Sequence, residues 1–409
     1  MSRSSIALSN LRGIVIVIVL AFHSVLAYLA SLPPEPFAFD TAPYRWQATP
    51  IIDTSRWFGF DLFCAWQDVS LMSLMFFLSG VFVPMSLKRK GARSFLSDRL
   101  LRIGLPLAIV VALVIPVAYY PAYAVTAADP SVAAFWQHWR ALPFWALGPQ
   151  WFLCQLLALN LIAAVLHHYM PQLTDRLGRL AAAAHEQPLK FFAGLVVISA
   201  VVYVPLALAY TPWAWTNTGP FSFQTSRPLH YLVYFFAGYA VGANGFERGL
   251  LAVDGALAHR WAWWTVAAFA GFFLWAGPTS LTLDGKQAPL IVHVVSDIGF
   301  AVACAAGSFF FLAICLRFAT RKHWVLDSLS ANAYDMYLNH YIFVVWLQYA
   351  VLGLGLFAAA KAAIVFCGTF VVSWAAAVAF SGLSLGAFFT QAKRWVPAKV
   401  GQKQDGPLR

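Results

Sequence analysis

A basic residue and a histidine interrupt the first long apolar run, Leu11 to Ala30. Arg12 and His23 are eleven residues apart, so in a helix their Cα atoms would lie roughly 16 Å apart along the axis. Eleven steps of about 100° bring both side chains to within roughly 20° of one face. We expect Arg12 at the mouth of a membrane span and His23 near its middle, because the hydrocarbon core is about 30 Å thick. A titratable imidazole inside a bilayer is a candidate functional group.

Two further arginines stand where another apolar run begins, in the segment SFLSDRLLRIGLPL. Ser97 is a candidate N-cap, and Arg99 and Arg102 would follow on neighbouring positions of one helix face. Two guanidiniums at a helix N-terminus, where the dipole is also positive, would bind an anion such as a phosphate. The alternative is ordinary basic charge flanking a span.

A polar stripe runs through the apolar segment SANAYDMYLNHYIF. Asn332, Asp335 and Asn339 fall at i, i+3 and i+7, and His340 adjoins them. His340 would lie roughly 15 Å into the membrane, a depth similar to that of His23. Hydrogen bonds between helices explain the asparagines equally well. Burial of Asp335 and His340 costs more, which favours a function for these two residues.

Other polar residues lie near the outer ends of the predicted spans, away from the ends that carry the three arginines. His293 and Asp297 are i, i+4 partners that could bind a polar substrate or satisfy each other. Asp68 just precedes an apolar run, and its structural alternative is a wet helix end. Together with Asn339, these are the candidate substrate-binding residues.

The composition indicates a polytopic membrane protein. Of 409 residues, 61% are hydrophobic and only 11% are charged, whereas soluble domains carry about 25% charged residues. The mean hydropathy is +0.70. The net charge of +11 is better explained by basic loops at an anionic leaflet than by nucleic acid. The five cysteines form no CxxC pair, and neither a disulfide framework nor a metal site is expected.

Apolar runs long enough to span a bilayer recur about ten times, which predicts an all-α membrane bundle. The predicted spans are 9–30, 66–87, 99–121, 150–168, 190–210, 229–246, 261–278, 289–316, 331–352 and 361–382. The first run is expected to be a retained helix rather than a cleaved signal peptide. Residues 1–390 would form one transmembrane domain and residues 391–409 a basic cytoplasmic tail.

The distribution of Lys and Arg predicts that both termini are cytoplasmic. With the N-terminus inside, only 6 of the 27 basic residues fall in outward loops. Those six are Arg45, Arg56, Arg140, Arg227, Lys286 and Lys361. The same topology places Arg12 at the cytoplasmic end of the first helix.

Smaller signals complete the pattern. The segment FFLSGVF places Ser79 and Gly80 among large apolar residues, which is typical of a close contact between membrane helices. The sequence contains no GxxxxGK[ST] motif, which argues against an ATP-driven pump.

Taken together, these motifs resemble the integral-membrane acyltransferase-3 family. The resemblance rests on Arg12-x10-His23, FFLSG, Arg99-x-x-Arg102, WFL at 151–153 and SANAYDMYLNH, in this order. It extends from Asn10 to about Leu383. The block from Phe76 to Pro106 is also similar to the glucan-modifying branch, which succinylates periplasmic glucans.

The resemblance implies ten membrane helices and acyl transfer from acyl-CoA to a hydroxyl of a carbohydrate. His23 matches the essential histidine of the family and Arg12 the arginine of its first helix. Arg99 and Arg102 match an arginine pair thought to handle the CoA donor. His340 falls where the family often has histidine.

The resulting hypothesis is a membrane O-acyltransferase that uses acetyl-CoA or succinyl-CoA as co-substrate, with no tightly bound cofactor and no metal. His23 would act as general base, and Asp335 or His340 would orient its imidazole or bind the acceptor. The expected partners are acyl-CoA, a glycan acceptor and the lipid bilayer of a bacterial inner membrane, with homo-oligomerisation left open. A transporter or flippase for a glycan or lipid-linked sugar is the alternative, because polar groups inside the membrane also mark transport pathways.

Overall fold

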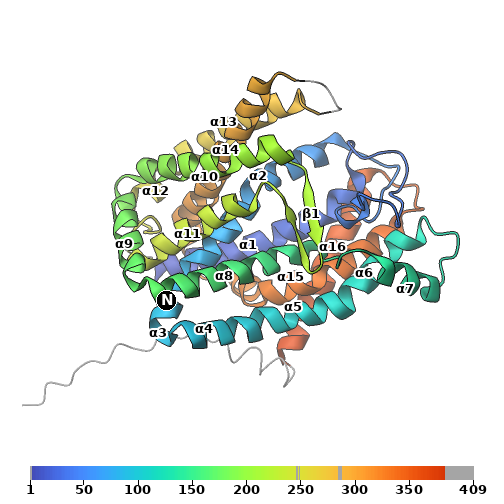
Figure 1. Ribbon diagram of the computed structural model, residues 1–409, viewed down its shortest axis with the longest axis horizontal. Coiled ribbons are helices and arrows are strands. Elements are labelled where there is room, and N and C mark those ends of the chain that lie inside the picture. Colours follow the sequence, from blue (N-terminus) through green and yellow to red (C-terminus); the bar gives the residue numbers. More distant parts are fainter. Residues whose placement is uncertain (1, 246, 248, 284–287, 383–409) are drawn as a thin grey trace, which may run out of the picture.

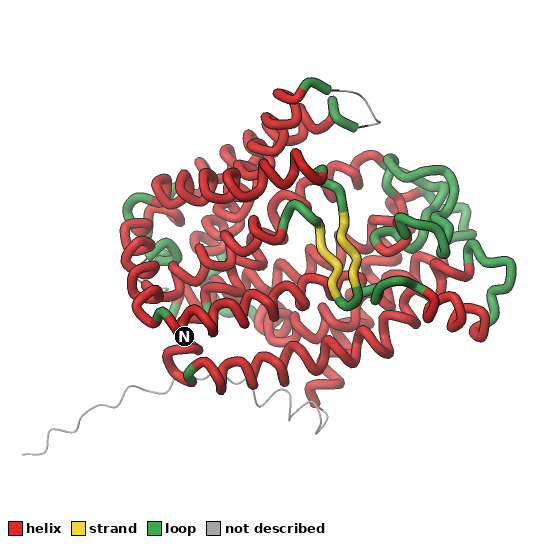
Figure 2. Tube along the Cα trace, in the orientation of Figure 1, coloured by secondary structure: helices red, strands yellow, loops and turns green. Residues whose placement is uncertain are grey.

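The computed structural model describes residues 2–245, 247, 249–283 and 288–382 (Figure 1). Long helices lie side by side and run roughly along the longest axis of the molecule, and one short hairpin lies among them (Figure 2). The protein is therefore an all-α bundle, as the apolar runs predict. The predicted tail, residues 391–409, lies outside the described residues.

The elements follow one another as a series of long helices with short helical turns between them. In chain order they are α1 (Arg3–Val25), η1 (Leu26–Tyr28), η2 (Arg45–Gln47), α2 (Phe58–Val81), α3 (Val83–Lys90), α4 (Ala92–Arg99), η3 (Leu100–Gly104), α5 (Leu105–Ile109), η4 (Val110–Val114), α6 (Ile115–Ala124), α7 (Val132–Ala141), η5 (Gly148–Gln150), α8 (Trp151–Tyr169), α9 (Pro171–Ala182), η6 (Ala183–His185), α10 (Pro188–Tyr210), β1 (Trp215–Thr218), β2 (Phe221–Gln224), α11 (Pro228–Asn244), α12 (Ala256–His259), α13 (Trp261–Ser280), α14 (Leu290–Phe318), α15 (Trp324–Val351) and α16 (Ala358–Gly382).

Each apolar run of the sequence coincides with a helix or with a series of helical segments. Seven of these, within the described residues, are long and apolar enough to cross a membrane. They begin at Arg3, Phe58, Ala92, Gly148, Pro188, Leu290 and Ala358. Helices α11, α13 and α15 coincide with the three other predicted spans. The count of ten spans and the side on which the termini lie stay predictions.

Helices α1 and α15 run parallel to each other, although about 300 residues separate them in the chain. Near their starts, the hydroxyl oxygens of Ser9 and Ser330 lie 2.9 Å apart. Further along, the Gln348 side chain donates a hydrogen bond of 3.0 Å to the carbonyl oxygen of His23. Residues of equal depth in the two helices therefore face one another.

Glycines allow α2 and α11 to cross in close contact. A Cβ atom on Gly80 would collide with the carbonyl oxygen of Phe235 on α11. A Cβ atom on Gly238 would likewise collide with the carbonyl oxygen of Phe77 on α2. Small residues let membrane helices approach with their backbones, so the close contact predicted from FFLSG is confirmed.

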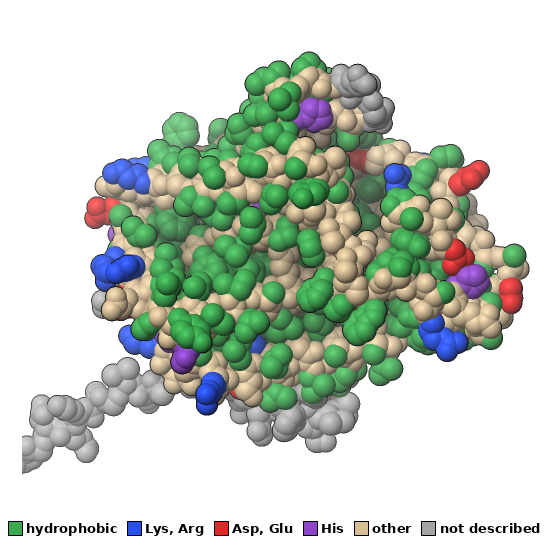
Figure 3. All heavy atoms as spheres, viewed as in Figure 1, with side chains coloured by type: hydrophobic (Ala, Val, Ile, Leu, Met, Phe, Trp, Pro, Cys, Tyr) green, Lys and Arg blue, Asp and Glu red, His purple; other side chains and the backbone are tan. Residues whose placement is uncertain are grey.

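The two ends of the bundle differ in charge and structure. Lys and Arg side chains gather on the face shown in Figure 3 mostly at the end that carries the N-terminus, which we call the N-terminal end. The opposite end, the loop end, holds α7 and the long connection from Ala30 to Trp57 that precedes α2 (Figures 1 and 2). The hairpin of β1 and β2 pairs Trp215 with Gln224 and Thr218 with Phe221.

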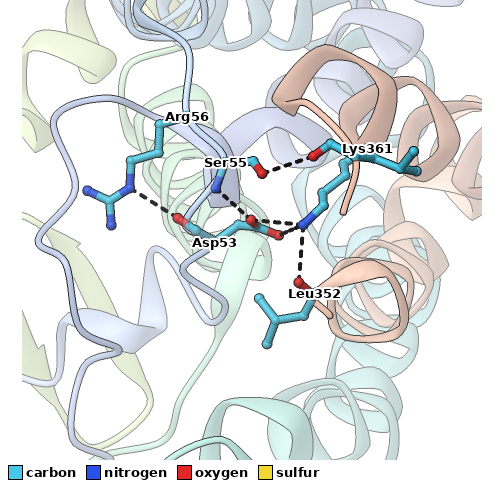
Figure 4. A network of polar contacts seen from close by, with 6 residues as sticks. Asp53, Ser55, Arg56, Leu352 and Lys361 are labelled. Carbon is cyan, nitrogen blue, oxygen red and sulfur yellow. Dashed lines mark hydrogen bonds and ion pairs between the residues drawn. The ribbon is translucent and has the colours of Figure 1, made fainter. Parts of the chain in front are cut away.

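A buried ion pair ties this connection to the rest of the bundle (Figure 4). The ammonium group of Lys361, on α16, contacts both carboxylate oxygens of Asp53 at 3.0 and 2.8 Å. It also donates to the carbonyl oxygen of Leu352 at 3.1 Å. The sequence pattern placed Lys361 in an outward loop, but its side chain is 1% exposed and fully paired.

Candidate active site

A stacked pair of histidines lies between α1 and α15. The imidazole rings of His23 and His340 are nearly parallel, with an interplanar angle of 15° and centroids 5.1 Å apart. The parallel course of the two helices brings these residues to the same depth, as the sequence predicts for His340. The structure thus brings together two candidate catalytic residues that are separated by more than 300 positions in the chain.

The hydrogen bonding of His340 determines its tautomer. Its Nδ1 atom lies 2.8 Å from the carbonyl oxygen of Tyr337. A carbonyl oxygen can only accept, so Nδ1 carries the proton and Nε2 keeps its lone pair. The residue is 0% exposed, and Nε2 has no hydrogen-bond partner among the described residues. His340 therefore presents a buried basic nitrogen that accepts no hydrogen bond from the residues that the structure describes.

His23 is half-buried, and its Nδ1 atom also lacks a partner within the described part of the chain. The predicted span, 9–30, extends beyond the end of the helix, and the depth of His23 in the membrane stays a prediction. Helix α1 ends at Val25, so His23 lies in its last turn. The chain then leaves the helix through η1, and the carboxylate of Asp61 binds the backbone N–H groups of Ala30 and Ser31.

Arg12 lies towards the N-terminal end of the bundle. Its guanidinium sits over the ring of Phe82, 4.8 Å from the centroid, at the point where α2 ends. The neighbouring Asn10 donates to the carbonyl oxygens of Ala319 and Arg321, just after α14 ends. Arg12 therefore lies where several helices terminate, which agrees with its predicted position at the mouth of a span.

The arginine pair does not stand at a helix N-terminus, so this part of the prediction is wrong. Gly91, at a φ of 73°, separates α3 from α4, and the helix begins at Ala92. Ser97 is therefore an interior residue rather than an N-cap. Arg99 closes α4, and Arg102 lies in the π-helical turn η3 of the same continuous span. Free N–H groups and the helix dipole cannot contribute to an anion site there.

Arg99 and Arg102 still form a basic pair at the N-terminal end. The Arg99 guanidinium lies over the ring of Phe95, 4.9 Å from its centroid, and its Nε atom is buried without a partner among the described residues. Both arginines interact electrostatically with Asp98, which is paired with Lys90. π-helical turns recur at functional sites, and η3 includes Arg102.

Asp68 occupies a different environment from the one expected. Helix α2 begins at Phe58, so Asp68 lies nearly three turns inside the helix rather than at a wet end. Its two carboxylate oxygens each contact the guanidinium of Arg227 at 2.7 Å. Arg227 is 1% exposed and lies over the ring of Phe300, although the sequence placed it in an outward loop. This bidentate geometry is typical of a structural ion pair.

The match with known proteins comes from a family model described as an acyltransferase domain, that of the acyltransferase-3 family, which aligns with residues 5–378. The chain belongs to this family. Comparisons with curated proteins and with solved structures found no match. The family and the apolar helices together identify a multi-pass membrane acyltransferase.

Two of the polar residues of α15, both asparagines, donate hydrogen bonds away from the histidine pair in this acyltransferase. Asn332 donates to Ser328 in its own helix, and Asn339 donates to the carbonyl oxygen of Ser373 on α16. Asp335 precedes His340 by five residues, which places it about 140° around the helix. On an ideal helix the two residues do not share a face, and a role for Asp335 at the imidazole pair stays a prediction.

His293 and Asp297 lie in the first turns of α14. Within the described residues no hydrogen bond joins them, and Asp297 is 3% exposed. The intervening Ser296 instead pairs with Thr279 of α13 at 2.7 Å. The residues that the structure describes include no group of three or more His, Cys, Asp or Glu side chains that could hold a metal ion.

The sequence patterns missed two residues around the histidine pair of the acyltransferase. Gln150 is fully buried, contacts the backbone of α15 and leaves its Oε1 atom without a partner among the described residues. The ring of Tyr341 meets His23 edge-on, with centroids 5.6 Å apart. Both stand beside recognised motifs, since Gln150 lies in GPQWFL and Tyr341 follows His340. Neither residue is charged, so the pattern of charges in apolar runs did not select them.

Proposed function

We propose that this acyltransferase transfers an acetyl or succinyl group from acyl-CoA to a hydroxyl of a carbohydrate or glycan, with His23 as general base. The observation that carries the proposal is the stacked pair of imidazoles with unpartnered ring nitrogens. Buried polar atoms are normally hydrogen-bonded. Within the described ranges, Nδ1 of His23 and Nε2 of His340 have no partner, which leaves hydrogen-bonding capacity for a substrate.

The donor would enter from the N-terminal end. Its phosphates would bind Arg12, Arg99 and Arg102, because arginine forks pair bidentately with phosphate oxygens. Arg12 and His23 lie on the same helix, about 16 Å apart along its axis. The pantetheine arm would span this distance and bring the thioester to the imidazole. The basic N-terminal end supports a cytoplasmic location for this entrance.

The acceptor would reach His23 from the loop end, because His23 lies in the last turn of α1. The hydroxyl oxygen attacks the thioester carbonyl while the imidazole takes the hydroxyl proton. The tetrahedral adduct then releases the CoA thiolate, which receives that proton. His340, held through Nδ1, would orient His23 or bind the acceptor. General base catalysis of this kind typically contributes roughly 10²–10⁴-fold to the rate.

The test is turnover by the purified enzyme in detergent, with labelled acetyl-CoA and succinyl-CoA and a panel of glycan acceptors. We expect acceptor-stimulated CoA release by the wild type and loss of at least about 10²-fold in His23→Ala, with unchanged folding. His168→Ala is the matched control, because His168 is exposed at the end of α8. Full activity of His23→Ala would contradict the proposal. Glycan flux into liposomes without acyl-CoA consumption would instead support a transporter.

A further inference from the structure

The ring of one tyrosine packs beside the histidine pair, and its hydroxyl group makes only long hydrogen bonds within the described part of the chain. Tyr341 is 3% exposed, and its ring packs edge-on against His23. Its hydroxyl faces two groups at the loop end of the site. These are the hydroxyl of Tyr119, from α6, and the carbonyl oxygen of Gln47, from η2, each 3.3 Å away.

The distances around Gln47 show that the hydroxyl group of Tyr341 makes only weak hydrogen bonds. Tyr119 already donates to the carbonyl oxygen of Gln47 at 2.6 Å. Hydrogen bonds between hydroxyl and carbonyl oxygens are usually about 2.7–2.8 Å long. Both contacts of Tyr341 are longer, and a hydroxyl has a single proton to share between them. Tyr341 can therefore redirect its O–H group at little cost.

The backbone nearby fixes the position of the Tyr341 ring. Gly148 has a φ of 53°, and a Cβ atom there would lie 3.2 Å from Cε1 of Tyr341 and 3.1 Å from the hydroxyl of Tyr119. Only a glycine readily combines this conformation with so close an approach. The next residue, Pro149, accepts a hydrogen bond from Tyr337, which also orients His340 through its carbonyl group.

We infer that Tyr341 is a further catalytic residue, whose hydroxyl donates a hydrogen bond to the oxyanion of the acyl-transfer intermediate. The inference rests on the proposed function. When the acceptor oxygen forms its bond to the thioester carbon, the π electron pair moves to the carbonyl oxygen, and His23 takes the acceptor proton. The O–H group of Tyr341 stabilises that negative charge without losing its proton. The C–S bond then breaks, the carbonyl re-forms, and the thiolate takes the proton from His23.

A buried donor on a ring that the neighbouring backbone holds in place is suited to this role. Such donors act on charge that develops in the transition state, and the loss of one typically costs about 10²–10³-fold in kcat. The competing role for Tyr341 is to anchor the connection that contains Gln47. Tyr119 distinguishes the two roles, because it makes the shorter bond to the same carbonyl oxygen and would be the stronger anchor.

The experiment compares Tyr341→Phe and Tyr119→Phe in the full-length enzyme in detergent, with whichever labelled donor, acetyl-CoA or succinyl-CoA, the wild type consumes. We expect Tyr341→Phe to lower kcat by about 10²–10³-fold with little change in KM for the donor. Tyr119→Phe should keep most of kcat. Thermal unfolding of both variants checks that the fold is intact.

Three results would overturn the inference. A wild-type kcat in Tyr341→Phe, while His23→Ala is inactive, would refute the donor role and leave the proposed function standing. An equal or larger loss in Tyr119→Phe would assign the effect to anchoring of the connection. An active His23→Ala enzyme would refute the proposed function and this inference together.

Discussion

Two buried polar contacts join distant parts of the chain, and they differ in how completely they are satisfied. Lys361 and Asp53 are each 1% exposed, and all three donors of the ammonium group have partners within 3.1 Å. His23 and His340 also meet across more than 300 residues, yet each leaves a buried ring nitrogen without a partner among the described residues.

This difference distinguishes a buried polar contact that stabilises the fold from one that can bind a substrate. A buried charge must be paired, because leaving it alone costs several kcal/mol. In the pair of Lys361 and Asp53, the ammonium group has no donor left for a ligand. A buried neutral imidazole costs less, so the fold tolerates unpaired nitrogens where a substrate completes the hydrogen bonds. Substitutions at the ion pair should therefore lower stability, whereas substitutions at the histidine pair should lower the rate of acyl transfer.

The largest effect is expected from His340→Asn. The asparagine amide can still donate to the carbonyl oxygen of Tyr337, so the fold should survive, but the basic nitrogen is lost. We expect acyl transfer to fall by about 10²-fold or more with an unchanged thermal midpoint. CoA release and thermal unfolding measure the two quantities. Wild-type turnover would show that His340 has a structural role, like that of Lys361.

Lys361→Met should cause a free-energy change of comparable size, but in the free energy of unfolding rather than in the rate of acyl transfer. This variant leaves the carboxylate of Asp53 buried and unpaired, which should destabilise the protein by about 3–5 kcal/mol. The double variant Asp53→Leu with Lys361→Met removes both charges and should recover most of the loss. Denaturant or thermal unfolding in detergent provides the measurement. A rate per folded molecule that falls as far as in His23→Ala would contradict the distinction between the two regions.

The smallest effect is expected from Arg102→Ala, because Arg102 is half-buried and solvent screens part of its charge. One lost charged hydrogen bond to a CoA phosphate should weaken the apparent affinity for acyl-CoA by about tenfold. Arg93→Ala is the matched control, since Arg93 is exposed on α4. KM for acyl-CoA reports the change. Equal KM values for both variants would count against a phosphate role for Arg102.

Local patterns predicted the elements of this protein well and their ends less well. Apolar length and small residues in FFLSG are properties of one segment, so the helices and a close contact at FFLSG were predictable, whereas the partner helix α11 was not. Helix ends were not, because capping depends on neighbours. Gly91 restarts the helix before Ser97, and Asp61 binds the backbone just beyond η1.

The burial of two basic residues was also not predictable from local patterns. Arg227 and Lys361 were assigned to outward loops from their positions relative to the predicted spans, with the N-terminus inside. Their partners, Asp68 and Asp53, are more than 150 positions away in the chain. No local pattern identifies such a pair, since the low cost of burial exists only once both charges are in contact.

The amino-acid sequence alone determined that this is a helical membrane acyltransferase with basic residues at one end and two histidines at similar depth. Only the tertiary structure decided that those histidines stack, that His340 keeps its lone pair on Nε2, and that Tyr341 lies beside them. The physical reason is that composition and periodicity are properties of a single segment of the chain. Stacking, tautomer and donor geometry instead depend on how α1, α6, α15 and the Gln47 connection pack against one another.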